Sequence, residues 1–367
     1  LTVHTGKVDI GQRVSTALAL IAAEELDVPF ERIDVDDVDT AVSLDEEYTS
    51  ASNSVERCGQ SVRLAAATAR RHALGLAAEM LAANVESLEI HDGTIRAKDS
   101  GRSVTYWDLY GDRRFEIPVD PSIATKSPRD YRVIGRKHPA LDLVELVGET
   151  APFLHDLALP GMLHARLVRP PHQHARVESI DSDIKRALGD AEFVRDGSFL
   201  AVVAADEYQA VQTAARLVPL VRWHAERTLD VTPIHELLRK APKISLPVRN
   251  GEAVEEPVPP LAPPPAAAEV TLQATIERPY LMHGSIGPSA AVALFDNGTM
   301  TIWTHTQGVF PLRLTIAESL GMDADNVRLI QKRGPGCYGH NGADDAALDA
   351  ALIARAVPGR PVMLKWS

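Results

Sequence analysis

The segment "NVRLIQKRGPGCYGHNGADDAALDAALIARAV", Asn326 to Val357, carries a strand pattern, a glycine-rich loop and a helix pattern in that order. The loop holds four glycines within nine residues, namely Gly334, Gly336, Gly339 and Gly342. Because glycine costs backbone entropy, this density predicts either tight turns or a ligand that approaches the backbone closely. The acidic pair Asp344 and Asp345 suits the first turn of the helix. The loop thus leads into a helix N-terminus, a common place for binding an anionic group.

Two nucleotide-binding patterns fit this loop poorly. A phosphate-binding P-loop ends in Gly-Lys-Ser/Thr, whereas this loop ends Gly342-Ala343-Asp344. The spacing of Gly334, Gly336 and Gly339 matches a dinucleotide-binding loop, but the short βαβ context is missing. A tight structural turn therefore explains the glycines about as well as a binding site does.

Cys337 and His340, three residues apart in the same loop, suggest a zinc site or a Cys-His nucleophile. Zinc needs three or four ligands, and no second cluster in the sequence supplies them. A Cys-His pair needs a third group that orients the histidine, and sequence alone does not place one. A buried, apolar cysteine is the favoured interpretation.

The composition of the chain limits the classes of protein to which it can belong. The length of 367 residues favours two or three domains, and the apolar and charged content is typical of a soluble globular protein. A formal charge of −12 opposes unspecific attraction to nucleic acid or an anionic membrane. Cys58 and Cys337 are the only cysteines, so this chain alone builds neither a disulfide framework nor a four-cysteine zinc or iron–sulfur site. No apolar run is long enough to span a bilayer.

Both ends of the sequence lie in strand-like patterns. The chain begins with "LTVHTGKVDI", without an initiator methionine or a signal peptide, and it ends with "RPVMLKWS". We therefore expect a fragment, or one subunit of something larger.

The first part of the chain alternates helix and strand patterns. Apolar spacing from Val14 predicts a helix that ends before Pro29, and "ERIDVDDV" predicts a strand. A second, alanine-rich helix is expected to end near Ala82, and "SLEIHDGTIRA" predicts a hairpin that turns at Asp92-Gly93.

A proline-containing connector, about 117–130, leads to a strand–strand–helix pattern. The segment "EEPVPPLAPPPAAA" then holds six prolines in fourteen residues and predicts an extended linker. After it come a hairpin turning at Asn297-Gly298 and a helix with Gly321 as its C′ residue.

Three further polar turns precede predicted helices. "TQGVF", Thr306 to Phe310, places the Gln307 amide after a strand, and "GKVDIGQ" precedes the first helix. Thr49, Ser52 and Ser54 precede the alanine-rich helix, where simple N-capping by Ser52 or Ser54 is the more economical interpretation of each hydroxyl taken singly. With the glycine loop, these turns make sense together around one large, anionic cofactor.

Five segments in order carry a resemblance to a known family: "GKVDIGQ", "YTSASNSVERCGQ", "LPGMLHARLVRPP", "WTHTQGVFPLR" and "GPGCYGHNGADDAALDAALIA". The chain resembles, over nearly its whole length, the molybdopterin-binding subunit of the xanthine dehydrogenase/aldehyde oxidase family, in the isoquinoline 1-oxidoreductase and nicotinate dehydrogenase branch. The resemblance implies an α+β fold in which molybdenum-cofactor-binding domain pieces flank an α/β hammerhead domain. The implied ranges are 1–116 and 269–367 for the cofactor-binding pieces, 117–130 for the connector, 131–226 for the hammerhead domain and 227–268 for the Pro-rich linker.

The same resemblance implies a site. Gln307 matches the glutamine that hydrogen-bonds an oxo-type ligand on molybdenum, while the metal itself is held by the pterin dithiolene and by no protein atom. The resemblance implies that Cys337 and His340 contribute main-chain atoms and the wall of the cofactor site, and that they act neither as a nucleophile nor as metal ligands. The implied cofactor-binding residues are Gln12, Thr49, Ser52, Ser54, Gly308, Val309, Phe310, Gly336, Cys337, Tyr338, Gly339 and His340.

Three departures from the family pattern stand out. Arg13 replaces the last glycine of the usual Gly-Gln-Gly, and Gly287 stands where many members carry glutamate. The family's catalytic glutamate, its general base, belongs to a later segment that this sequence does not include. We therefore expect the base and the rest of the cofactor cage to come from elsewhere.

By resemblance, the chain is part of a molybdenum hydroxylase that oxidises an aldehyde or an N-heterocycle, with water as the oxygen source. The implied cofactor is molybdopterin cytosine dinucleotide, and electrons leave to a separate [2Fe–2S] subunit, with flavin or haem only in partner subunits. A chain carrying the remaining molybdenum-domain half is the other implied partner. The cytoplasm is the expected compartment, with the periplasm as the alternative. The rivals are a noncatalytic scaffold of the same fold and a nicotinamide-dependent dehydrogenase that uses the Gly334 loop.

Overall fold

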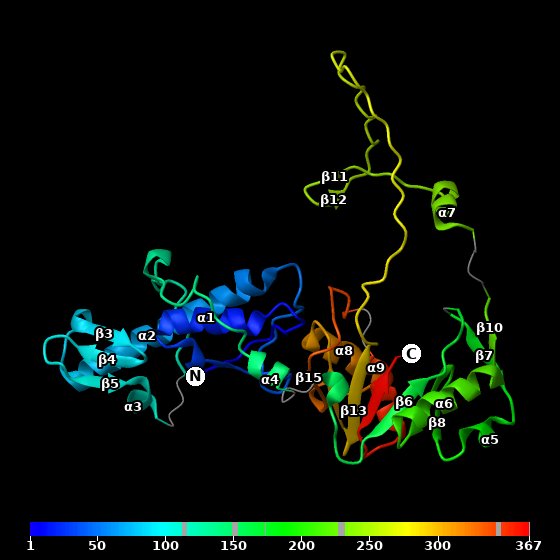
Figure 1. Ribbon diagram of the computed structural model, residues 1–367, viewed down its shortest axis with the longest axis horizontal. Coiled ribbons are helices and arrows are strands. Elements are labelled where there is room, and N and C mark those ends of the chain that lie inside the picture. Colours follow the sequence, from blue (N-terminus) through cyan, green and yellow to red (C-terminus); the bar gives the residue numbers. More distant parts are fainter. Residues whose placement is uncertain (112–115, 149–152, 173, 227–231, 343–345, 367) are drawn as a thin grey trace. The chain divides into compact units, whose positions relative to one another are not determined.

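The computed structural model describes residues 1–111, 116–148, 153–172, 174–226, 232–342 and 346–366 (Figure 1). The chain divides into two compact units. The larger one comprises Leu1–Pro170, Arg176–Trp223 and His283–Ser367, and the smaller one comprises Pro171–Ala175 and His224–Met282. All of the features that bear on the site lie in the larger unit.

The N-terminal part of the larger unit is built on two helices, α1 (Val14–Leu26) and α2 (Gln60–Leu81), which pack against each other. A three-stranded antiparallel sheet, β3 (Leu88–His91), β4 (Thr94–Ala97) and β5 (Ser103–Thr105), shares their apolar core. Asp92 and Gly93 have φ values of 49° and 67°, as a tight two-residue hairpin turn requires. The predicted helices and hairpin are confirmed.

Three local expectations were wrong. The strand predicted over "ERIDVDDV" is only β2 (Asp34–Val35), and the first ten residues contribute only its short parallel partner β1 (Thr2–Val3). Neither predicted serine caps the long helix, because a π-helical turn, Ser54–Gly59, runs into α2 without a side-chain cap. Consecutive acidic residues in "ERIDVDDV" disfavour a long strand.

A seven-stranded sheet forms the second half of the unit, in the order β15-β14-β13-β16-β6-β9-β8. Pairing is antiparallel except for β14 with β15 and β16 with β6. The strands are β6 (Leu163–Leu167), β8 (Glu192–Asp196), β9 (Phe199–Ala204), β13 (Ala290–Asp296), β14 (Thr299–Thr304), β15 (Val327–Gln331) and β16 (Val362–Lys365). Strands expected in two separate domains, 131–226 and 269–367, therefore share one sheet.

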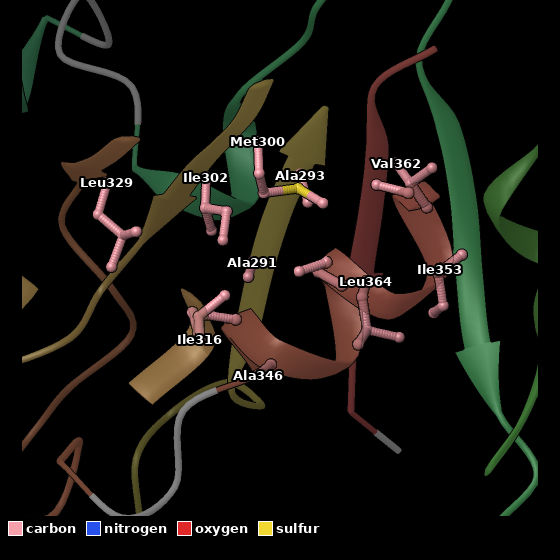
Figure 2. Close-up of a cluster of buried hydrophobic side chains, with 14 of the residues drawn as sticks. Ala291, Ala293, Met300, Ile302, Ile316, Leu329, Ala346, Ile353, Val362 and Leu364 are labelled. Atoms are coloured by element: carbon pink, nitrogen blue, oxygen red, sulfur yellow. The ribbon is translucent and has the colours of Figure 1, made fainter. Parts of the chain in front are cut away.

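Helices cover both faces of this sheet. The main core lies between one face and helices α8 (Val309–Leu320) and α9 (Ala347–Ala356) (Figure 2). In that view Ile316 and Ile353 lie in the same cluster as strand residues such as Ile302. Alternate residues of β9 face the other way, in a second apolar cluster with α6 (Glu207–Leu217). Gly321 ends α8 in the left-handed conformation, as predicted.

The remaining elements are short. The larger unit also contains α3 (Tyr106–Tyr110), α4 (Leu143–Val147), α5 (Ile184–Leu188) and β7 (Arg176–Ile180), which pairs with β10 (Val221–His224). The smaller unit contains α7 (Ile234–Lys240) and the hairpin β11 (Val248–Arg249) and β12 (Glu252–Ala253). In the part of the chain that the structure describes, no helix is both long and apolar enough to cross a membrane.

Candidate functional site

The centre of the candidate site is a contact between Thr49 and Gln307, which are 258 residues apart in sequence. The Thr49 N–H donates to the Gln307 carbonyl at 2.8 Å, and Gln307 Nε2 donates to the Thr49 carbonyl at 3.0 Å. Thr49 Oγ1 also accepts from the N–H of Val8 at 2.9 Å. Both residues are buried. Three segments that the sequence analysis selected, around Val8, Thr49 and Gln307, therefore meet at one point.

The Gln307 amide is only half satisfied. Its nitrogen faces the Thr49 carbonyl, which fixes the orientation of the amide, and its Oε1 is buried without a hydrogen-bond partner among the described residues. A buried polar atom left unpaired costs about 1–3 kcal/mol, so such atoms are uncommon unless a ligand or water completes them. The Gln307 turn therefore has the character of a binding site.

Tyr48 explains the glycine that directly follows Gln307. A Cβ on Gly308 would lie 2.6 Å from Cδ1 of the Tyr48 ring, and a Cβ on Gly342 would lie 3.4 Å from Cε1. The ring therefore packs directly on the backbone at Gly308. Within this chain, the space next to that glycine is filled by a side chain of the protein itself. Val309 and Phe310, the next two residues, begin α8 and are buried in the main core.

His305 joins the same turn to the glycine-rich loop. Its side chain is 2% exposed, and a Cβ on Gly334 would lie 2.6 Å from His305 Cβ and Cγ. Nε2 accepts a hydrogen bond from the N–H of Ala290 at 3.0 Å, and Asn341 Nδ2 donates to the His305 carbonyl at 3.0 Å. Burial, with a smaller contribution from the charge of His155, lowers the pKa of His305 to about 4. The ring is therefore neutral at ordinary pH.

The rest of the loop forms a compact wall. Ser285 donates to the carbonyl of Gly336 at 2.9 Å, and the rings of His283 and His340 stack with centroids 4.3 Å apart. Cys337 is buried, as predicted, and its Sγ accepts from the N–H of Gly339 at 3.4 Å. Tyr338, by contrast, is exposed and has a φ of 55°. Asp344 and Asp345, assigned to the first turn of the following helix, lie outside the described residues.

The side chain of Gln12 stabilises the Gly6–Gln12 loop through two hydrogen bonds to main-chain atoms of that loop. Gln12 Oε1 accepts from the N–H of Ile10 at 2.7 Å, and Nε2 donates to the carbonyl of Val8 at 2.9 Å. Both ends of this amide are thus already engaged, which leaves one Nε2 proton for a cofactor. Of the other expected hydroxyls, Ser52 is exposed and Ser54 is half-buried.

Arg13 is engaged in an ion pair. It has a φ of 63°, the left-handed conformation that favours glycine, and its guanidinium lies 2.7 Å from Asp142. Arg333 contacts Asp142 as well, and its other nitrogen lies 3.5 Å from Asp9. The Arg13 guanidinium is therefore directed at a carboxylate of the same chain.

Sequence reasoning missed four residues of the site: Tyr48, His305, Asn341 and Lys7. The buried Lys7 ammonium donates to the carbonyls of Glu46 and Tyr48, and so holds the segment that carries the Tyr48 ring. Next to it, burial raises the pKa of Cys58 to about 12, with the Glu46 carboxylate also opposing ionisation. Adjacency to Gln307 and the glycine loop was the only signal for His305 and Asn341.

The hydrogen-bond donors and acceptors of this site suit a ligand that presents an uncharged polar edge. Among the described residues, no group of three or more His, Cys, Asp or Glu side chains is placed to hold a metal ion. Backbone amides and the side chains of Gln307 and Asn341 supply the polar atoms instead. This residue set fits a ligand that brings its own metal chelate, since the protein then needs to supply only hydrogen bonds and shape.

Two family profiles match the chain, and both are described as a molybdopterin cofactor-binding domain. One covers residues 1–129 and the other residues 262–367. The first contains Gln12 and Thr49, and the second contains Gln307 and the glycine-rich loop. The residues that meet in the candidate site are thus contributed by both matched domains.

Three curated relatives align with almost the whole chain. A nicotinate dehydrogenase subunit of Pseudomonas putida is 32% identical over 98% of this chain and 30% of its own length. The beta subunit of isoquinoline 1-oxidoreductase from Brevundimonas diminuta is 24% identical over 98% of this chain and 52% of its own length. A membrane-bound aldehyde dehydrogenase of Gluconacetobacter polyoxogenes, whose name gives pyrroloquinoline quinone as cofactor, is 24% identical over 99% of this chain and 48% of its own length.

The chain thus spans between 30% and 52% of the length of these relatives. The similarity nevertheless runs through both cofactor-binding domains and the region between them. With a molybdopterin cofactor-binding domain near each end and such relatives along its length, this chain belongs to the molybdopterin-binding subunits of the xanthine dehydrogenase family.

Proposed function

We propose that this chain is the part of a molybdenum hydroxylase that holds one side of the molybdenum–pterin cofactor. The observation that carries the proposal is the buried Gln307 amide, locked onto Thr49 and left with an unpaired Oε1. Its turn joins two segments that belong to different cofactor-binding domains. The bound cofactor would supply the metal centre that accepts two electrons from an aldehyde or an N-heterocycle.

The residues of this chain would bind and orient that cofactor. Gln307 offers its second Nε2 proton and its free Oε1 to polar atoms of the ligand, and the Thr49 contact prevents the amide from rotating. Gly336 and Gly339 expose backbone at the loop, where a Cβ on Gly339 would meet nothing within 4 Å. Cys337 and His340 contribute wall surface and no metal ligand. Positioning of this kind is what an enzyme adds to a cofactor that already carries the reactive centre.

Several finer assignments are part of the same proposal and rest on the family resemblance. The cofactor is the cytosine dinucleotide form, water is the oxygen source, and electrons pass to a separate [2Fe–2S] subunit. Residues 131–226 form a hammerhead domain, and the remaining molybdenum-domain half with the general base is supplied from outside this sequence. The assembled enzyme works in the cytoplasm, with export to the periplasm as the alternative.

The rival proposal is a noncatalytic scaffold of the same fold. Tyr48 favours it, because its ring already fills the space beside Gly308. Arg13, at a position where the family has glycine, favours it as well. A third possibility, suggested by the name of one relative, is a quinone cofactor.

Elemental analysis of the assembled protein distinguishes these proposals. We expect about one molybdenum per copy of the chain, a marked loss in Gln307→Ala, and no loss in the control Gln60→Ala, whose side chain is exposed. Extraction of pyrroloquinoline quinone without molybdenum would support the third possibility. Fully assembled protein that oxidises its substrate with neither group would refute the molybdenum proposal.

A further inference from the structure

Asn341 has the buried, half-paired geometry of Gln307, at a position to which no role is assigned. Its side chain is 1% exposed, and the amide nitrogen lies 2.7 Å from His305 Nδ1 and 3.0 Å from the His305 carbonyl. The other amide atom, Oδ1, is buried and has no hydrogen-bond partner in the part of the chain that the structure describes. One end of the amide therefore holds the Gln307 turn, through His305, and the other end makes no hydrogen bond to the described residues.

The hydrogen bonds around His305 cannot all be satisfied within this chain. The Ala290 N–H makes Nε2 an acceptor, so the neutral ring carries its proton on Nδ1. The short contact between Nδ1 and Asn341 Nδ2 then brings two donors together. Rotating the amide by half a turn would relieve that contact but would press Oδ1 against the His305 carbonyl. In both orientations one amide atom faces His305 and the other stays buried and unpaired.

Two unpaired amide atoms thus belong to one turn and the loop beside it, Gln307 Oε1 and Asn341 Oδ1. Native proteins leave few buried polar atoms without partners, because each costs about 1–3 kcal/mol. In the orientation that lets Asn341 Nδ2 donate to the His305 carbonyl, both unpaired atoms are acceptors, so the group that completes them carries hydrogen-bond donors. Ring N–H and amino groups of a flat heterocycle are donors of this kind, and the Tyr48 ring beside Gly308 and Gly342 offers an aromatic neighbour.

We infer that Asn341 is a ligand-binding residue of the site, whose free amide oxygen accepts a hydrogen bond from an N–H group of a heterocycle. The inference rests on the proposed function, under which two sources of that heterocycle exist: the pterin of the cofactor and an N-heterocyclic substrate. The His305 contact is a second, positioning role of the same side chain.

The test compares Asn341→Ala and Asn341→Asp with wild type and with Asn326→Ala, a control in an exposed turn of the same region. Each assembled protein is prepared from cells that make the pterin cofactor and from cells that do not. Molybdenum and pterin content, KM for an N-heterocyclic substrate, and the difference in Tm between loaded and cofactor-free protein are measured. The Tm difference separates the two roles, because losing the His305 contact lowers both values whereas losing a ligand contact reduces their difference.

For Asn341→Ala we expect cofactor content, or substrate affinity, to fall about fivefold to tenfold, as for one lost hydrogen bond. Asn341→Asp keeps an acceptor and is expected to bind better than Asn341→Ala. Reduced cofactor content and a smaller Tm difference identify the pterin, whereas full content with a raised KM identifies the substrate. If wild type contains the cofactor and Asn341→Ala matches it in cofactor content, KM and Tm difference, the inference about Asn341 is overturned and the proposed function stands. A wild type without molybdenum overturns the proposed function with it.

Discussion

A methyl group added to Gly308 gives a direct test of the geometry around Tyr48. The new Cβ would lie 2.6 Å from Cδ1, 2.9 Å from Cε1 and 3.1 Å from Cγ of the Tyr48 ring. Carbon atoms are not tolerated below 3.0 Å from such a Cβ, so either the ring or the backbone must move. Overpacking of a well-packed core costs about 1–3 kcal/mol, and because Tyr48 is 42% exposed its ring has room to shift, which favours the lower part of this range. Gly308 has a φ of −152°, where any residue is allowed, so the predicted cost arises from the ring and not from backbone strain.

The assay is thermal unfolding of the purified protein, followed by chemical denaturation. At about 2–4 °C per kcal/mol for a domain of 150–250 residues, Gly308→Ala should lower Tm by about 2–12 °C. Tyr48→Ala should remove the obstacle, so that Gly308→Ala costs much less in the Tyr48→Ala background than in wild type. This non-additivity is the expected signature of two residues in contact.

Gly75→Ala serves as the matched control. Gly75 lies inside α2, has an ordinary helical φ and has no atom within 4 Å of an added Cβ, so alanine should stabilise the protein by about 0.5–1 kcal/mol. The two glycine substitutions are thus expected to have opposite signs. If Gly308→Ala costs the same with and without the Tyr48 ring, the assigned packing is incorrect.

Three further outcomes follow from ionisable groups near the site and in α1. Burial raises the pKa of Glu24, but the N–H groups of residues 132–134 and the Lys126 charge outweigh it and lower the pKa overall. Glu24→Gln should therefore destabilise the protein at neutral pH by about 1–3 kcal/mol. Equilibrium denaturation should show that the difference in unfolding free energy between wild type and Glu24→Gln becomes smaller as pH falls through the folded-state pKa of Glu24. The pKa of His305 is lowered to about 4, so wild type should lose stability as pH falls from about 6.5 towards 4. Urea denaturation of His305→Gln over the same pH range should not show this loss of stability. Arg13→Gly trades an ion pair with Asp142 for relief of a left-handed φ, so stability should change by less than about 1 kcal/mol and molybdenum content should not change.

Much of the fold could be predicted from local patterns. Helical apolar spacing gave α1, α2, α8 and α9, and the Asp-Gly and Asn-Gly dipeptides located two hairpins, because both signals act within one element. The seven-stranded sheet was beyond this reasoning. Its junction pairs Val362 with Leu163 across about 200 residues, and no local pattern encodes such a register.

The site was predictable in part for the same reason. Glycine and glutamine turns mark places where backbone is exposed, and they led to Gln307 and the glycine-rich loop. Tyr48 and His305 are ordinary residues in the sequence, and their importance arises only because they pack on Gly308 and Gly334. Gln12 lay where expected but turns back on its own loop, a choice between intramolecular and ligand hydrogen bonds that residue type does not decide.

The parallel junction between β16 and β6 has a consequence for cutting the chain. One strand precedes the exposed, proline-rich stretch and the other follows it, so a single break in that stretch leaves the main-chain pairing of Val362–Leu364 with residues 163–165 intact. Two polypeptides produced by such a break would still be held by the sheet and by the main core. The chain is accordingly a candidate for split-protein complementation, with reassembly of the sheet as the event that reports the reunion of its halves.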